Sequence, residues 1–205
     1  MKLIWHGHAC YTLESSQGTV VFDPFEPEYV PGIPTPELAA DLVLCSHFHN
    51  DHGCAQAVRQ TKRVTAVKVE TLECFHDEAL GAKRGSNLIH IVEAEGKRIV
   101  HMGDLGHLLD AEQLERLGKV DVLLIPVGGF YTIDAMQAHT LAEKIGAAVT
   151  VPMHYRGEGF GFDVIAPVED FTCLRGSVEY AGGNVLELDG ELGQGRTVVL
   201  RCPVK

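Results

Sequence analysis

A run of metal-ligand side chains, His-Phe-His-Asn-Asp-His beginning at His47, is the sequence feature that most constrains how this chain can fold. The apolar stretch Leu42–Ser46 directly before it predicts a buried strand. Side chains alternate in an extended segment, so His47 and His49 project to the same side and can bind one metal ion. Asp51 and His52 follow where the chain turns and can reach a second ion. The fold must therefore bring these side chains together around a metal ion at the end of the strand. A solvent-exposed histidine-rich turn would place no such constraint on the fold.

The ligand types in this run narrow the choice of metal without deciding its role. Imidazole nitrogen and carboxylate oxygen suit zinc, iron or manganese. From this run alone the site can hold one ion or two, and the ions can be catalytic or structural. Metal identity is equally open, because loading follows cellular availability as well as affinity.

Composition restricts the class of protein and its partners. With 205 residues the chain is long enough for a substantial core, and we expect one domain over residues 1–205. The net charge of −11 disfavours nucleic-acid binding, yet it allows an anionic small-molecule substrate because bound cations reverse the local field. Six cysteines without a CxxC pair suggest reduced thiols, and no apolar segment approaches the length of a membrane span. The expected location is the cytoplasm, and the oligomeric state stays open.

Apolar segments and turn signals predict an order of strands and helices. The expected strands span residues 2–14, 19–23, 42–45, 63–69, 71–76, 88–94, 97–103, 120–127, 149–153, 184–188 and 197–201. The expected helices span residues 53–60, 110–117, 134–145 and 167–175, with Asp110 and Asp134 as N-caps. The proline-rich stretch 24–36 cannot sustain regular structure and should form a surface loop. Strands interleaved with helices in this way suggest two sheets covered by helices.

Further histidine and aspartate residues follow at predicted strand ends. They are His76, Asp104 and His154, and an earlier aspartate, Asp23, lies directly before a proline. Together with the run at His47 they give the order HxHxDH, a separate His, a later Asp and a final His. In this order the chain resembles the metallo-β-lactamase-fold superfamily over almost its full length. The resemblance implies an α/β fold of four layers, an αββα sandwich in a single domain, with the site along one edge of the two sheets.

Within that superfamily the chain is most similar to the compact branch related to ascorbate-6-phosphate lactonase and N-acyl-phosphatidylethanolamine phospholipase D. Five separated motifs carry this likeness, within Gly7–Cys10, His76–Asn87, Met102–Asp104, Pro126–Gly129 and Val151–Tyr155. The interval between His52 and His76 is shorter than in true β-lactamases, so we do not expect antibiotic hydrolysis. Motifs of this kind indicate family more strongly than substrate.

The resemblance implies a role for each ligand. The first metal ion would be bound by three histidines, His47, His49 and His76. The second would be bound by Asp51, His52 and His154. Asp104 would bridge both ions, and Asp51 can also orient or deprotonate the attacking water, so these two aspartates are the expected catalytic residues.

The chemistry that such a centre supports defines the expected function. Two divalent ions about 3.5–4 Å apart can hold a water between them, lower its pKa towards neutrality and polarise the scissile bond. We therefore expect a dinuclear metal-dependent hydrolase that uses a metal-bridged water to cleave an ester-like bond in a small, anionic substrate. Phosphodiester, lactone and thioester bonds all stay open. Zinc is the first expectation for the two ions, with manganese or iron as alternatives.

Five polar residues around the ligands each leave two interpretations open. By resemblance, Asp23 supports the histidine-rich loop, although Asp-Pro also starts turns. His8 can orient a ligand or serve as a structural histidine. Arg84 and Asn87 can bind a substrate phosphate or carboxylate, or stabilise their own loop. Tyr131 can donate to a developing oxyanion or act structurally.

Other classes of protein fit the sequence less well. A serine hydrolase would need a GxSxG elbow, and a P-loop protein would need GK[ST]; neither motif is present. An iron oxidoreductase of the flavodiiron type would need a flavin-binding partner domain, for which this chain has no room. A nuclease of the superfamily would normally carry a basic surface and an extra module. The serious alternative is a non-catalytic metal-binding or regulatory protein of the same fold, whose signature would be a missing ligand.

Overall fold

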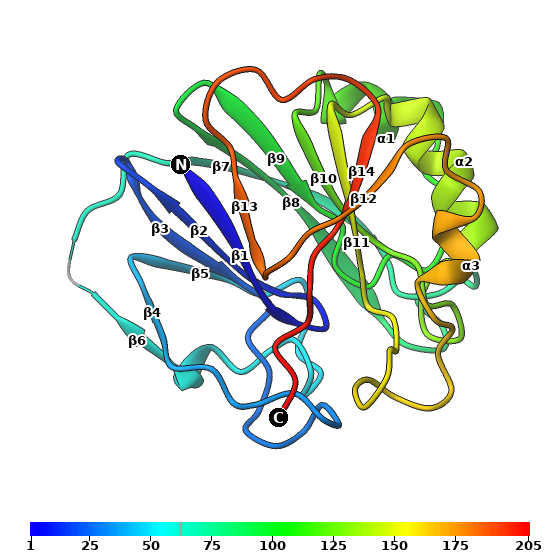
Figure 1. Cartoon of the computed structure of the whole chain (residues 1–205), viewed down its shortest axis with the longest axis horizontal. Helices are drawn as coiled ribbons and strands as arrows, with labels where there is room; N and C mark the ends of the chain where they lie inside the picture. The colour runs from blue at the N-terminus through cyan, green and yellow to red at the C-terminus, as the bar shows by residue number, and fades with distance from the viewer. Residues whose placement is uncertain (62) are drawn as a thin grey trace.

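Two sheets packed face to face form the centre of the computed structural model, which describes residues 1–61 and 63–205 (Figure 1). The first sheet has the strand order β13-β1-β2-β3-β5. Its strands are β1 (Lys2–Gly7), β2 (Cys10–Ser15), β3 (Gly18–Phe22), β5 (Leu42–Leu44) and β13 (Val185–Glu187). Neighbours from β13 to β3 are antiparallel, whereas β3 and β5 are parallel. Consequently β1, β3 and β5 all run towards the same edge.

The second sheet has the strand order β12-β14-β11-β10-β9-β8-β7. Its strands are β7 (Lys68–Phe75), β8 (Ser86–Ala94), β9 (Lys97–His101), β10 (Val122–Pro126), β11 (Val149–Met153), β12 (Val178–Tyr180) and β14 (Arg196–Val199). From β9 to β12 all neighbours are parallel, and β8 is antiparallel to both β7 and β9. The carboxyl ends of β7, β9, β10 and β11 therefore also share one edge.

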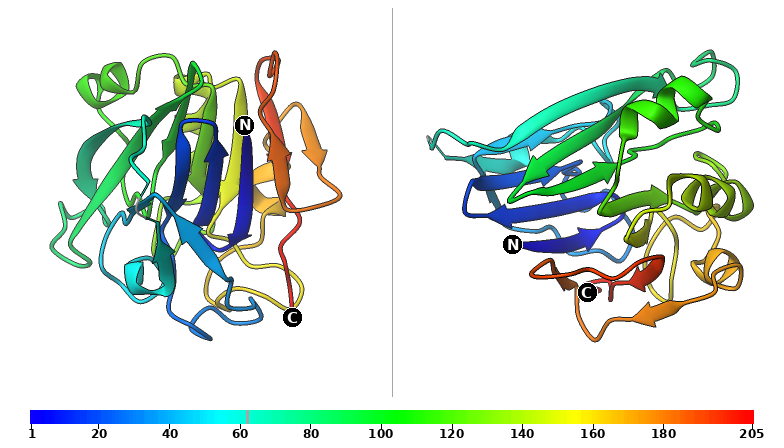
Figure 2. Two further views of the ribbon diagram at one scale, coloured as in Figure 1. Left: turned by 90° about the vertical axis from the view of Figure 1, so that its left-hand side faces the viewer. Right: turned by 90° about the horizontal axis from the view of Figure 1, so that it is seen from above.

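Helices cover the outer face of the second sheet, on the right in Figure 1 and at the right-hand side of the view from above in Figure 2. They are α1 (Ala111–Leu117), α2 (Ala135–Ile145) and α3 (Glu169–Thr172). Asp110 and Asp134 cap α1 and α2 in complete capping boxes, as the sequence predicts. On the other side, a two-stranded ribbon of β4 (Leu38–Ala40) and β6 (Val58–Gln60) lies beside β3 and β5. The layered sandwich expected from the sequence is thus present as one mixed α/β domain.

Three predicted elements differ from the structure. The expected strand 2–14 is two strands, because Gly7 (φ +103°) and His8 (φ +52°) turn the chain with backbone angles that end a strand. The expected strands 63–69 and 71–76 are one strand, β7, since Glu70 and Thr71 continue the ladder with β8. The expected helix 53–60 is a single 3-10 turn, Ala55–Ala57, followed by β6, because no side chain caps its start and Val58 pairs with Leu38 instead.

The proline-rich stretch 24–36 is irregular, as predicted, but it is not only a surface loop. Phe25, Val30 and Ile33 are buried and belong to the core between the sheets. These three side chains anchor the stretch beside the edge at which the strands end. Among the residues that the structure describes, no helix has both the length and the apolar character needed to cross a membrane.

Candidate metal centre

The predicted site residues follow strand ends at the shared edge of the two sheets. Three come from the first sheet and three from the second: His8 after β1, Asp23 after β3, His47 after β5, His76 after β7, Asp104 after β9 and His154 after β11. Parallel strands deliver their carboxyl ends to one edge, so residues far apart in the sequence meet there. This topology explains why single residues, spaced along most of the chain, build one site.

The ligand atoms fall into overlapping clusters in which all atoms lie within 4.8 Å of one another. One cluster consists of His47, His49 and His76; another of Asp51, His52, His154 and His8; and a third of His47, His52 and Asp104. The first two contain the two ligand triads expected from the sequence, and the third lies between them. The structure therefore brings all the predicted ligands together.

Asp104 lies between the two triads. Its Oδ2 is 3.3 Å from His76 Nε2 and 3.2 Å from His154 Nε2, and its Oδ1 is 3.2 Å from His52 Nε2. The carboxylate thus contacts one histidine of the first triad and two of the second. This is the position that a bridging ligand requires.

Asp23 orients one histidine of each triad through hydrogen bonds. It is fully buried, and its Oδ2 accepts hydrogen bonds from His52 Nδ1 (2.8 Å) and from the Ser46 hydroxyl (2.6 Å). The Ser46 oxygen is in turn 3.0 Å from His47 Nδ1. Because the Nδ1 atoms of His47 and His52 are used in this way, their Nε2 atoms are left for another partner. Of the two interpretations of Asp23, loop support fits this geometry.

The electrostatics of Asp23 agree with a permanently ionised support. Burial alone raises the pKa of its carboxyl group, but the charge of His101 and the hydrogen bond and charge of His52 outweigh burial and lower the pKa well below its usual range. Asp23 therefore keeps its negative charge beneath the histidines, where it favours a cation at the opposite ring nitrogens.

His76 and Asp104 are held through partners on neighbouring loops. His76 Nδ1 donates to the Tyr131 carbonyl oxygen (3.1 Å), which directs its Nε2 towards Asp104. The Asp104 backbone N–H donates to Asn87 Oδ1 (2.9 Å), while Asn87 Nδ2 donates to the Met102 carbonyl (2.9 Å). Asn87 is fully buried and does not face the cleft. Of the two roles that the sequence left open for Asn87, only the structural one fits.

Several buried ligand atoms make no well-aligned hydrogen bond within the part of the chain that the structure describes, although the Asp104 oxygens lie close to His52 and His154. These ligand atoms are His47 Nε2, His52 Nε2, Asp104 Oδ1 and both ring nitrogens of His154. A buried polar atom without a partner costs about 1–3 kcal/mol, so such a group is retained only where something else binds it. Four unpartnered residues converging on one point have the donor chemistry of a zinc, manganese or iron site.

The charge balance around His52 also favours a cation. Burial lowers the pKa of His52, but the carboxylates of Asp104 and Asp51 outweigh burial and raise the pKa well above its ordinary value. Positive charge is therefore stabilised at this point of the cleft, which is the electrostatic condition for binding a divalent ion.

Comparison with known proteins agrees with this geometry. The family model described as "Beta-lactamase superfamily domain" matches residues 2–154. The chain belongs to the β-lactamase superfamily. It is 30% identical to a UPF0173 metal-dependent hydrolase of Thermoplasma acidophilum, over 87% of this chain and 92% of that protein, and 32% identical to one of Methanoculleus marisnigri, over 76% and 81%.

Solved structures of the superfamily share the fold. A proposed Zn-dependent hydrolase of the metallo-β-lactamase superfamily from Thermotoga maritima is 37% identical, with a TM-score of 0.79 over 97% of each chain. The metallo hydrolase Igni18 of Ignicoccus hospitalis is only 19% identical and shows the fold alone, with a TM-score of 0.64 over 100% of this chain and 96% of that one. These likenesses support the coarse prediction of a metal-dependent hydrolase with the metallo-β-lactamase fold.

Three residues of the site have a strained backbone conformation. His8, Asp23 and His154 have positive φ angles of +52°, +43° and +54°, which residues other than glycine rarely adopt. The His154 N–H donates to the His8 carbonyl (3.3 Å), which itself accepts from the Trp5 indole (3.0 Å). The core therefore holds these turns in conformations that aim their side chains into the site.

Two glycines allow the loops of this superfamily site to press together. A Cβ atom at Gly103 (φ +54°) would lie 2.4 Å from both Ser46 Cβ and Asn87 Oδ1. A Cβ atom at Gly106 would lie 2.3 Å from backbone atoms of His76 and Asp77. Any larger side chain would thus separate the Asp104 turn from the loops that carry the histidines.

A cleft of about 150 Å³ opens above the ligands. Its lining consists of His49, Asp51, His76 and Asp104 with three aromatic residues, Tyr29, Tyr131 and Phe162. The sequence predicted a role for Tyr131 but not for Tyr29 and Phe162. No local pattern marks these two, because Tyr29 lies in the proline-rich stretch and Phe162 in an irregular loop after β11.

Arg84 and His8 do not line this cleft themselves, but each contacts a residue that does. Arg84 lies at the rim, where its Nη2 donates to the Phe130 carbonyl (3.0 Å) and its guanidinium carbon is 5.6 Å from the Tyr131 ring centre. His8 is buried beside the second triad, with Nε2 3.2 Å from Asp51 Oδ2. His8 thus orients a predicted ligand, while Arg84 presents a cation to whatever enters the cleft.

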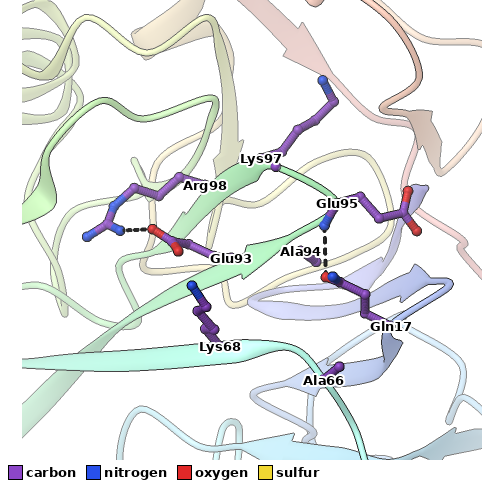
Figure 3. Close-up of a pocket in the computed structure, with 9 residues that line it drawn as sticks. Gln17, Ala66, Lys68, Glu93, Ala94, Glu95, Lys97 and Arg98 are labelled. Atoms are coloured by element: carbon purple, nitrogen blue, oxygen red, sulfur yellow. Dashed lines mark hydrogen bonds and ion pairs between the residues drawn. The ribbon is translucent and has the colours of Figure 1, made fainter.

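A larger hollow of about 280 Å³ lies at the opposite end of β7 and β9 (Figure 3). It surrounds the β8–β9 turn and is lined mainly by charged side chains, which include Lys68, Glu93 and Arg98. Arg98 forms an ion pair with Glu93, and the Glu95 N–H donates to the Gln17 side chain (2.9 Å). This hollow contains none of the predicted site residues.

Proposed function

We propose that this protein is a dinuclear metal-dependent hydrolase that cleaves an ester-like bond, a phosphodiester, lactone or thioester, in a small anionic molecule. The observation that carries the proposal is the position of Asp104 between two complete ligand triads. A single structural ion would need only one of these triads and no shared carboxylate. We extend the proposal to residues 1–205 as one hydrolase domain.

The donor set assigns the metal positions in this proposal. One ion would be held by His47, His49 and His76, the other by Asp51, His52 and His154, with Asp104 shared. When bound, two divalent ions supply a water acidic enough to attack near neutral pH and a positive charge that polarises the scissile bond. Zinc is the first candidate, and manganese and iron fit the same donors.

The protein's own groups then bind substrate and move protons. The Asp51 side chain is 17% exposed and lines the cleft, so its carboxylate can accept a proton from the attacking water while His8 keeps it oriented. The Tyr131 phenol lines the same cleft, where it can donate to negative charge that develops on the substrate. Arg84 attracts an anionic group to the rim.

Size and charge support a small-molecule substrate. A cleft of about 150 Å³ admits a small functional group rather than a polymer. The net charge of −11 opposes nucleic acid as a partner. The six cysteines carry free thiols in the part of the chain that the structure describes, which fits a reducing compartment such as the cytoplasm.

Elemental analysis and a substrate screen test this proposal. Protein purified without chelators should contain two divalent ions per chain and should turn over a member of a phosphodiester, lactone and thioester panel. Asp51→Asn should abolish turnover while circular dichroism shows an unchanged fold. If Asp104→Ala still binds two ions, the bridging assignment is wrong. A fully loaded protein that turns over nothing in the panel would instead support the non-catalytic alternative.

A further inference from the structure

Three aromatic residues, Tyr29, Phe162 and Tyr131, line the cleft side by side, and we call this group the aromatic box. Phe162 lies in the middle, with ring centres 6.1 Å from Tyr29 and 6.4 Å from Tyr131. Both tyrosine rings are steeply inclined to Phe162, at 71° and 74°. The Phe162 ring also packs against His8, at 5.5 Å, which places the box directly beside the second triad.

The hydrophobic core accounts for one ring of this box, Phe162, which packs against it, but not for the two tyrosines. Tyr29 and Tyr131 belong neither to the buried core nor to the side chains packed against it, and Tyr29 remains 44% exposed. Large aromatic surfaces gain most from burial, and exposed apolar surface gathered at a cleft marks a binding site. The missing apolar partner is therefore expected to come from a ligand.

Backbone hydrogen bonds hold the box in place before any ligand binds. The Gly161 N–H, next to Phe162, donates to the Pro31 carbonyl (2.9 Å), and the Tyr29 N–H donates to the Glu26 carbonyl (3.1 Å). The Tyr131 carbonyl accepts from His76 Nδ1. The backbone that carries the three rings is thus held near the metal ligands, which lowers the entropy that binding would cost.

Charge decides which kind of apolar group fits. Aromatic boxes commonly bind quaternary ammonium ions. Here Arg84 already lies over the Tyr131 ring, and its loop is fixed by Asp77, whose carboxylate accepts backbone N–H groups from residues 79, 81, 83 and 84. A guanidinium group beside a cleft built for divalent ions disfavours a second organic cation and favours an uncharged ring joined to an anion.

We propose that Tyr29, Phe162 and Tyr131 form an aryl-binding subsite, so that the substrate carries an aromatic ring next to its anionic scissile group. This inference rests on the proposed hydrolase function and names the substrate class of the same cleft. The ring stacks within the box, the anionic group lies over the ligand triads, and Arg84 contributes its charge at the rim.

Matched phosphonates test the subsite without requiring turnover. Isothermal titration of the metal-containing protein would compare phenylphosphonate with methylphosphonate, which share the anionic group and differ only in the ring. One aromatic contact contributes about 2- to 12-fold in affinity, and a ring in the box would make at least two such contacts, so we expect the phenyl compound to bind about 10-fold more tightly. Phosphocholine is the third ligand, and tighter binding of its ammonium group than of the phenyl ring would overturn the proposal.

Variants locate the effect. Phe162→Leu and, independently, Tyr29→Leu should reduce the phenyl-to-methyl ratio towards one while leaving methylphosphonate binding unchanged. The matched control is Tyr180→Leu, an exposed aromatic residue on β12, which should retain the full ratio. Equal affinities in the unmodified protein would overturn the subsite. Failure of the hydrolase proposal gives a different result, in which the ratio is retained but no ester of the panel, aryl or alkyl, is cleaved.

Discussion

The two ends of β7 and β9 carry polar side chains in opposite arrangements. The edge where their carboxyl ends lie also receives the ends of β5 and β11, and there His52, Asp104 and His154 are buried with ligand atoms that lack partners among the described residues. At the amino ends, around the hollow of Figure 3, Arg98 and Glu93 are partly exposed and bind each other. The hollow is the larger of the two depressions, at about 280 Å³ against about 150 Å³.

The volume of a depression is therefore a poor guide to function in this molecule. Buried polar atoms without a hydrogen-bond partner are a better guide. Exposed ion pairs contribute about 0–1 kcal/mol and can arise on any surface. Buried groups without partners lower the stability of the fold. Among the described residues, Tyr11 and His90 also carry such atoms, but most belong to His8, His47, His52, Asp104 and His154 at one end, which indicates a ligand there. Four substitutions or treatments test whether the two ends differ as this comparison requires.

The largest effect is expected from Asp104→Asn, which removes the carboxylate shared by both triads. Metal content should fall to one ion or none per chain, and turnover should fall by about 10²–10⁴-fold. Elemental analysis and initial rates on the same preparation measure both quantities. Two ions per chain with normal rates would show that the two ends differ less than we infer.

Removing the metal should destabilise the protein, because the buried ligands at the carboxyl ends of the strands lose their partner. If free metal is present at about 100 times its dissociation constant, chelation should lower stability by about 2.7 kcal/mol, or about 5–10 °C in melting temperature. Differential scanning calorimetry with and without a chelator measures the shift. Asp104→Asn serves as the comparison and should show a smaller shift, because it has less metal to lose.

Asn87→Ala tests the support beneath the ligands. Loss of the hydrogen bonds to the Asp104 N–H and the Met102 carbonyl should cost about 1–3 kcal/mol in urea unfolding and about 10–100-fold in metal affinity. Ile89→Val loosens the same strand, β8, without touching Asp104. That control should reduce stability by about 0.5–1.5 kcal/mol and leave metal affinity unchanged. An equal loss of affinity in both variants would argue against a specific role for Asn87.

The smallest effect is expected at the opposite end, from Glu93→Gln. This variant weakens the ion pair with Arg98, so unfolding should change by less than about 1 kcal/mol and the change should shrink in high salt. Metal content and turnover should stay at the level of the unmodified protein. A loss of either would mean that the hollow in Figure 3 is coupled to the metal centre.

Local signals in the sequence were enough to predict the histidine-rich run as a candidate metal site and to predict the helix starts. The run at His47 is dense, and Asp110 and Asp134 begin helices through side chains that bond within a single turn. Such features depend on residues that are neighbours in the sequence, so they can be predicted without knowledge of the tertiary fold. The layered architecture with the site at one edge came from resemblance to the superfamily instead, and the strand order itself was not predicted.

Features that depend on contacts between residues far apart in the sequence were either not predicted or predicted wrongly. The turn at His8 lies within an apolar run and depends on the core that holds it. Val58 forms a strand only because Leu38 is available as a partner. Tyr29 and Phe162 reach the cleft from two separate loops. They meet only in the tertiary structure, so no local sequence pattern could have predicted their position.

Asp23 has a consequence for how the centre can change. One buried carboxylate binds His52 directly and His47 through the Ser46 hydroxyl, so histidines from both triads share a single foundation. A shift of this carboxylate moves both sets of ligands together. The two metal positions that we propose are therefore coupled through Asp23, and substitutions at this residue should alter both metal affinities in parallel.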